Sequence, residues 1–84
     1  MESLMGFPRF EGVVIDVDDV RVLVEVEPDL QLPSILFPMS LYRGKRYKGE
    51  VAVLRRVGNL LVCVVTNPAE GQSIEVNDLA TPFL

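Results

Sequence analysis

The chain contains no histidine and a single cysteine, Cys63. Without histidine, the Ser-His and Cys-His pairs that activate nucleophiles are impossible, and so are the usual histidine-based zinc sites. One cysteine excludes an internal disulfide and any multi-cysteine metal site. Gly44 and Gly49 match neither a P-loop nor a GxGxxG fingerprint. We therefore expect a protein that is not an enzyme and that binds no cofactor, metal ion or small-molecule substrate.

Long apolar runs are lacking as well. The longest, Leu60 to Val65, is far shorter than the roughly 20 residues that a helix needs to cross a bilayer. Residues 1–10 carry neither a basic leader nor a continuous apolar stretch, so they do not resemble a signal peptide. A lone cysteine gives no reason to expect an oxidising compartment. We predict a cytoplasmic protein that does not enter a membrane.

The sequence does have a high apolar content for its size. With 49% hydrophobic and 24% charged residues, the 84-residue chain is expected to form one globular domain rather than a disordered segment. Its mean hydropathy of +0.30 is high for a small monomer, because a small domain exposes a large share of its surface. We therefore expect some of the apolar surface to contact a partner.

Alternating valines predict a first β-hairpin. Apolar residues recur at every second position over 13–17 and again over 20–26, with a turn at Asp18-Asp19 between them. A second hairpin is predicted over 49–56 and 60–66, because Val57-Gly58-Asn59 supplies residues suited to a tight turn. These two hairpins are the core of the expected fold.

The segments outside the hairpins give weaker patterns. Residues 30–37 are expected to form a short third strand that Pro38 ends, and residues 39–48 a connector in which Ser40 to Arg43 form a single helical turn. A short last strand is expected over 73–76. We expect residues 77–84 to form a tail.

Five or six short strands without a longer helix indicate an all-β fold, a small five- to six-stranded antiparallel barrel. We expect it to be SH3-like. The alternative is an OB-like barrel, which usually has a helix between its third and fourth strands, for which residues 39–48 leave little room. The single domain of residues 1–84 would then carry ordered apolar arms, an N-terminal arm over 1–9 and a C-terminal tail over 77–84.

Six of the eight basic residues fall between Arg43 and Arg56, in a chain with twelve acids. We call residues 42–48 the basic segment; its candidate binding residues are Tyr42, Arg43, Lys45, Arg46, Tyr47 and Lys48. Cations among aromatics suit the phosphates and bases of single-stranded nucleic acid. The same cations also suit an acidic protein surface, including the first hairpin of another copy. The third alternative is that the basic segment is a solvated connector that binds no partner.

The second hairpin is apolar on both faces, although a small barrel needs only one for its core. The other face requires cover, either by the chain's own ends or by another subunit. The candidate anchors for neighbouring subunits are the apolar side chains of the two arms, Phe7, Phe10, Phe83 and Leu84. Cys63 lies within an apolar stretch and is expected to be a buried structural thiol.

Three functions are compatible with these features. The first is a non-enzymatic β-barrel module that acts through protein-protein contacts, as a subunit of a homo-oligomer or a larger assembly. The second is a single-stranded DNA or RNA-binding protein that uses the basic segment. The third is a small acidic inhibitor of a larger enzyme, with the acids of the first hairpin at the interface. We favour the first, because the acidic sequence, with a pI of about 4.6, opposes binding to a polyanion.

Overall fold

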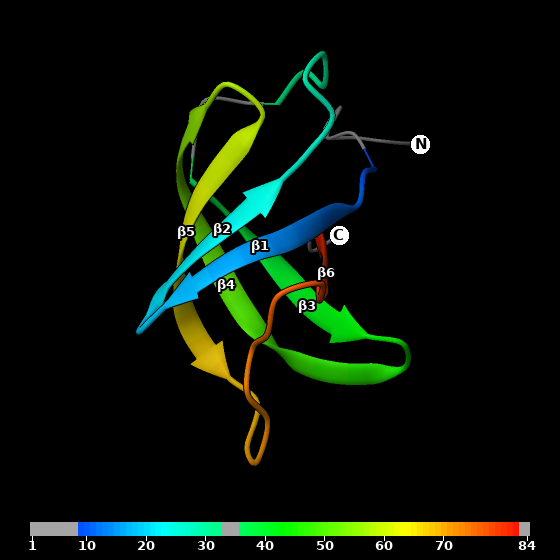
Figure 1. Cartoon of the computed structure of the whole chain (residues 1–84), viewed down its shortest axis with the longest axis vertical. Coiled ribbons are helices and arrows are strands. Elements are labelled where there is room, and N and C mark those ends of the chain that lie inside the picture. Colours follow the sequence, from blue (N-terminus) through cyan, green and yellow to red (C-terminus); the bar gives the residue numbers. More distant parts are fainter. Residues whose placement is uncertain (1–8, 33–35, 83–84) are drawn as a thin grey trace.

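The computed structural model describes residues 9–32 and 36–82 of the chain, and all its regular elements there are strands (Figure 1). In chain order these are β1 (Gly12–Asp18), β2 (Arg21–Glu25), β3 (Phe37–Arg43), β4 (Arg46–Val57), β5 (Leu60–Pro68) and β6 (Leu79–Pro82). Every pairing between them is antiparallel, in a closed barrel with the order β1-β2-β5-β4-β3-β6. The predicted all-β fold and antiparallel barrel are confirmed, with six strands.

The barrel closes through contacts between distant parts of the sequence. Strand β2 pairs with β5, and the short β6 pairs with β1 on one side and β3 on the other. In Figure 1, β1 and β2 cross in front of β4 and β3, and β6 lies between β1 and β3. A closed barrel leaves no long unpaired strand edge.

Inward-pointing side chains from all six strands fill the barrel. The buried apolar residues are Val14, Val22, Val24, Val26, Phe37, Met39, Leu41, Val51, Val53, Leu61, Cys63 and Ala80. Most of them follow the two-residue period of a strand, so that each strand sends alternate residues inward. Many of these core residues are the alternating valines that predicted the two hairpins.

Both predicted hairpins are present. The first has a tight turn in which Asp19 takes a φ of 58°, and Gly58 takes a φ of 62° in the second. A bulge interrupts β1 between Val14 and Asp16, where the register shifts against β2. Such a bulge increases the local twist and helps a sheet to curve into a barrel.

The predicted third strand and connector are wrong. The structure has β3 at Phe37–Arg43, so most of the expected connector is a strand, and no helical turn forms at Ser40. Pro38 lies inside this strand instead of ending it. It pairs with Ala52 of β4 and is exposed, so the proline is accommodated within the strand.

The predicted last strand is also misplaced. Residues 73–76 belong to the loop after β5, and the segment expected to be a tail contains β6 at Leu79–Pro82. A strand this short carries too few residues to show a two-residue period. Its position is fixed by partners on both sides and by Ala80, which is fully buried.

Candidate functional site

The basic segment forms the tip of the β3–β4 hairpin. Arg43 and Arg46 face each other across the turn, and Gly44 has a φ of 62°, which glycine adopts without strain. Tyr42 pairs with Tyr47 next to this turn. The register shifts between Leu41 and Tyr42, which leaves Lys48 as the extra residue of a bulge on β4.

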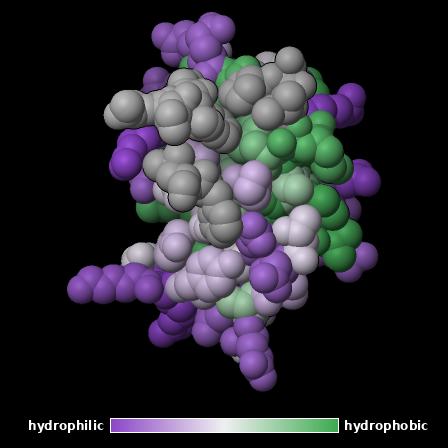
Figure 2. Space-filling view, turned by 180° about the vertical axis from the view of Figure 1, so that it is seen from behind, coloured by the Kyte–Doolittle hydropathy of each residue, from purple (hydrophilic) through white to green (hydrophobic). Residues whose placement is uncertain are grey.

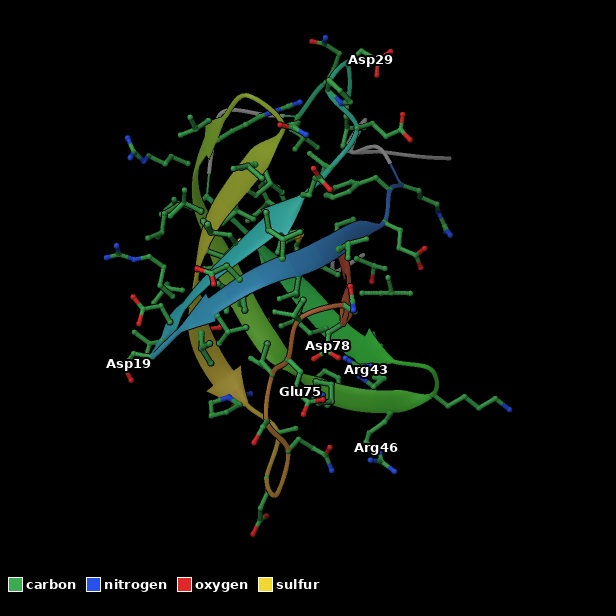
Figure 3. All side chains as sticks on the ribbon, viewed as in Figure 1. Asp19, Asp29, Arg43, Arg46, Glu75 and Asp78 are labelled. Carbon is green, nitrogen blue, oxygen red and sulfur yellow. The ribbon has the colours of Figure 1, made fainter. Side chains whose placement is uncertain are left out.

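This bulge redirects Lys48 into the protein. Its side chain is only 4% exposed, and its Nζ lies 3.0 Å from Oδ2 of Asp78, a residue with no exposed surface. Arg43 reaches the same carboxylate, with Nε 2.8 Å from Oδ1. The exposed Glu75 adds a carboxylate oxygen 3.6 Å from both cations. Figure 3 shows Arg43, Glu75 and Asp78 converging beside β3 and β4, while Arg46 points away.

Asp78 also fixes the loop that leads into β6. Its Oδ2 accepts a hydrogen bond from the Glu75 backbone N–H at 2.8 Å, and Arg43 donates to the carbonyl of Val76 at 2.8 Å. Burial acts to raise the pKa of Asp78. The hydrogen bonds from the Glu75 backbone, Lys48 and Arg43 outweigh it and lower this pKa below its usual 3.8. Asp78 is therefore held as a carboxylate between two cations, which is a structural role.

The predicted binding segment is thus divided in two. Arg43 and Lys48 are occupied by the ion pairs with Asp78, whereas Lys45 and Arg46 remain exposed at the tip. Tyr42 and Tyr47 are 36% and 39% exposed, with ring centroids 5.5 Å apart and planes tilted by 58°. This is a tilted aromatic pair that packs one ring against the other. The surface left for a partner is two cations beside two tyrosine edges.

Of the predicted apolar anchors, only Phe10 lies within the described residues. It is half-buried and packs against the barrel's own core. Phe7, Phe83 and Leu84 lie outside the described residues. The interface role of the arms therefore remains a prediction.

A second surface comes from the apolar hairpin that the sequence singled out. We call it the outer face and define it by six outward-pointing residues of β2, β4 and β5: Leu23, Ala52, Leu54, Leu60, Val62 and Val64. Leu54 is 47% exposed, and the other five are half-buried. Figure 2 shows hydrophobic side chains gathered along one side of the barrel, where β4 and β5 lie.

The sequence did not predict the roles of two residues that hold the fold together, Asp78 and Arg56. Asp78 lies in a segment expected to be a tail, where only its position as a lone acid among uncharged residues set it apart. Nothing in the sequence distinguished Arg56 from its exposed neighbour Arg55. The structure shows Arg56 donating to backbone carbonyls of four residues: Glu27, Pro28, Leu30 and Gly58. These bonds tie the β2–β3 connection to the β4–β5 turn.

Cys63 has the structural role that was predicted. Its side chain is fully buried in the core, and burial raises the pKa of the thiol to about 12. Within residues 9–32 and 36–82, no three side chains of Cys, Asp or Glu come together in a way that suits a metal ion. A shallow hollow near the hairpin tip is lined by Arg43, Lys45 and Arg46.

None of the described residues forms a helix that is long and apolar enough to cross a membrane. Comparison with protein-family models, with curated proteins and with solved structures found no match for this chain.

Proposed function

We propose that this chain is a non-enzymatic β-barrel module that acts through protein-protein contacts, as a subunit of a homo-oligomer or a larger assembly. The observation that carries the proposal is the outer face. Its side chains are apolar although they point away from a core that is already filled by the inward-pointing residues of the same strands. Half-exposed leucine and valine side chains gain free energy when a partner removes them from water.

The composition of the outer face is typical of the centre of an interface. Charged residues are depleted at such centres, and here they flank the apolar residues: Arg21 and Glu25 at the two ends of β2, and Arg55 on β4. Charges in that position steer a partner and fix its register more than they add affinity. The face therefore combines an apolar centre with a charged rim.

The two described groups with shifted pKa values, Asp78 and Cys63, support a non-enzymatic role. The Asp78 carboxylate is closed in by two cations, and the Cys63 thiol is buried with a raised pKa. A catalytic acid, base or nucleophile must reach the proton or atom that it acts on. Neither group lies open to a substrate.

Oligomeric state tests the proposal directly. We expect light scattering after size-exclusion chromatography to give a mass of at least two chains for the wild type. Leu54→Lys should lower this mass. Val76→Lys is the matched control, because Val76 is also 47% exposed but lies in the loop before β6. A wild type that stays monomeric at high concentration would refute self-assembly through this protein's own surfaces.

The exposed part of the basic segment supports a second candidate, a single-stranded nucleic-acid binder. Lys45 and Arg46 lie free at the hairpin tip beside the tyrosine pair. Such binding should weaken with salt and with the change of both cations to alanine. Fluorescence anisotropy with mixed-sequence oligonucleotides at low salt tests it, and no rise in anisotropy would dismiss this candidate.

A further inference from the structure

One row of residues crosses the outer face along the hydrogen-bonding direction. Asp16 of β1 pairs with Leu23 of β2, Leu23 pairs with Val62 of β5, and Val62 pairs with Arg55 of β4. The row therefore reads acid, leucine, valine, cation across four neighbouring strands. Its two ends have opposite charge, and its centre is apolar.

All four side chains of the row point away from the core. The residues on either side of Leu23, Val22 and Val24, are fully buried, so Leu23 points outward between them. The same holds for Val62, whose neighbours Leu61 and Cys63 lie in the core. Asp16 and Arg55 are exposed.

The charged ends of the row are available for a partner. Among the described residues, neither Asp16 nor Arg55 takes part in a hydrogen bond or salt bridge through its side chain. Three strand spacings separate them, which is about 14 Å at roughly 4.8 Å per strand. They are therefore too far apart to pair within one chain.

We propose that a second copy of this chain binds the outer face about a two-fold axis that runs parallel to the strands and passes between Leu23 and Val62. This rotation reverses the order of the row. Asp16 of each copy then lies opposite Arg55 of the partner subunit, and Leu23 lies opposite the partner's Val62. The inference rests on the proposed function, and it names the partner and the surface.

The charges at the two ends of the row favour this two-fold arrangement over its main competitor, in which Arg21 would instead lie opposite Glu25 of the partner subunit. An axis perpendicular to the strands would also bring the outer faces together, but it would set Asp16 against Asp16 and Arg55 against Arg55. Like charges in close contact across an interface cost several kcal/mol. A symmetric interface requires a patch that is complementary to itself, and the row meets this requirement in only one of the two orientations.

Charge reversal tests the pairing. In Asp16→Arg the new cation would face Arg55, and in Arg55→Asp the new acid would face Asp16, so each contact would occur twice per dimer. We expect each variant alone to weaken the dimer about 100-fold or more. Sedimentation velocity across a concentration series measures the dissociation constant.

Mixing the two variants gives the decisive result. In a dimer of one Asp16→Arg chain and one Arg55→Asp chain, both contacts again join opposite charges, so the mixture should form a one-to-one heterodimer. The variant that carries both changes in one chain should form a homodimer for the same reason. A different surface would not give this pattern of loss and recovery.

Controls keep the net charge matched. Asp29→Arg and Lys45→Asp change the charge by the same amounts at exposed positions away from the row, and both should leave the dimer intact. Far-UV circular dichroism checks the fold. If a reversal unfolds the chain, Asp16→Asn and Arg55→Gln replace it, with an expected loss of about tenfold each.

The outcomes separate this inference from the proposed function. If the wild type is an oligomer but the reversals leave it intact, or if mixing fails to restore the dimer, the two-fold arrangement is wrong and the assembly role stands. If Lys45→Asp dissociates the oligomer, the hairpin tip is the contact instead, and the inference is again wrong. A wild type that is monomeric throughout refutes this inference and the homo-oligomer form of the proposed function, and it leaves only assembly with a different protein.

Discussion

The Nζ of Lys48 lies 3.0 Å from Oδ2 of Asp78, and both side chains are buried. Thirty residues separate the two in the sequence. Lys48 lies on the β3–β4 hairpin, and Asp78 lies just before β6, the strand that closes the barrel between β1 and β3. The pair therefore joins the hairpin to the start of β6. A cation that the sequence presented as part of a binding surface is therefore a structural group.

We expect Asp78→Ala to destabilise the protein by about 3 to 5 kcal/mol, because it removes the buried counter-charge of the Lys48 ammonium and leaves only the exposed Glu75 carboxylate near it. Urea unfolding at a fixed protein concentration measures the change in the free energy of unfolding. Glu75→Ala is the control. The Glu75 side chain is 59% exposed and lies 3.6 Å from the same cation, so its loss should cost less than about 1 kcal/mol.

A double variant separates charge burial from packing. In Lys48→Met with Asp78→Leu, neither buried charge remains, so a large part of the stability lost in Asp78→Ala should return. If Asp78→Ala proves as stable as the wild type, Lys48 must find water or another partner in the folded state. The structural role of the pair would then be wrong.

The stability of the protein should depend on the ionisation of Asp78. The pKa of this carboxyl is lower in the folded state than its usual 3.8, so the unfolded chain binds its proton more readily. The stabilisation is therefore complete well above pH 3.8, and it is lost as the pH falls through the folded-state pKa. Unfolding free energies of the wild type and Asp78→Asn across acidic pH should converge at low pH. A constant difference would contradict the assignment.

Arg56 should be irreplaceable by lysine. Its planar guanidinium donates to the carbonyls of Glu27, Pro28 and Gly58 at 3.2, 3.0 and 2.6 Å, and also to that of Leu30. We expect Arg56→Ala and Arg56→Lys both to lose about 1.5 to 3 kcal/mol of stability, since an ammonium group cannot reproduce this fork. Denaturant unfolding measures it, with the exposed Arg46→Ala as control at less than about 0.5 kcal/mol. Full stability in the lysine variant would show that charge alone suffices.

The Cys63 thiol should be inert in the folded protein. Burial raises its pKa from 9.0 to about 12, so the thiolate fraction at neutral pH falls about 1,000-fold. Alkylation followed by mass spectrometry should show labelling in denaturant and essentially none under native conditions. Equal rates in the two conditions would mean that the barrel opens readily around β5.

The sequence predicted the parts of the fold that repeat a local pattern. Valine alternation located both hairpins, and Gly58 with Asn59 located the second turn, because these signals depend only on neighbouring residues. The sequence-based prediction was wrong for the positions of β3 and β6. Pro38 argued for the end of a strand, yet it lies inside β3 and pairs with Ala52 of β4, a contact between segments that the local sequence pattern does not record.

The candidate site divides in the same way. Cations and tyrosines marked the basic segment from the sequence, and the structure does place them at one hairpin tip. Which of those cations are free was not predictable, because the bulge that turns Lys48 inward is a property of the register between two strands. The partner of Lys48 lies in a loop whose position depends on the closed barrel.

By itself, the sequence determined that this chain forms an antiparallel β-barrel with a surplus of apolar surface, because strand periodicity and composition are local properties. Only the tertiary structure decided how that surface and the charges are used. Barrel closure through β6 buries Asp78, which then forms salt bridges with Arg43 and Lys48. Pairing across four strands aligns Asp16, Leu23, Val62 and Arg55 on one face. Both results arise from contacts between residues far apart in the chain, which no local pattern records.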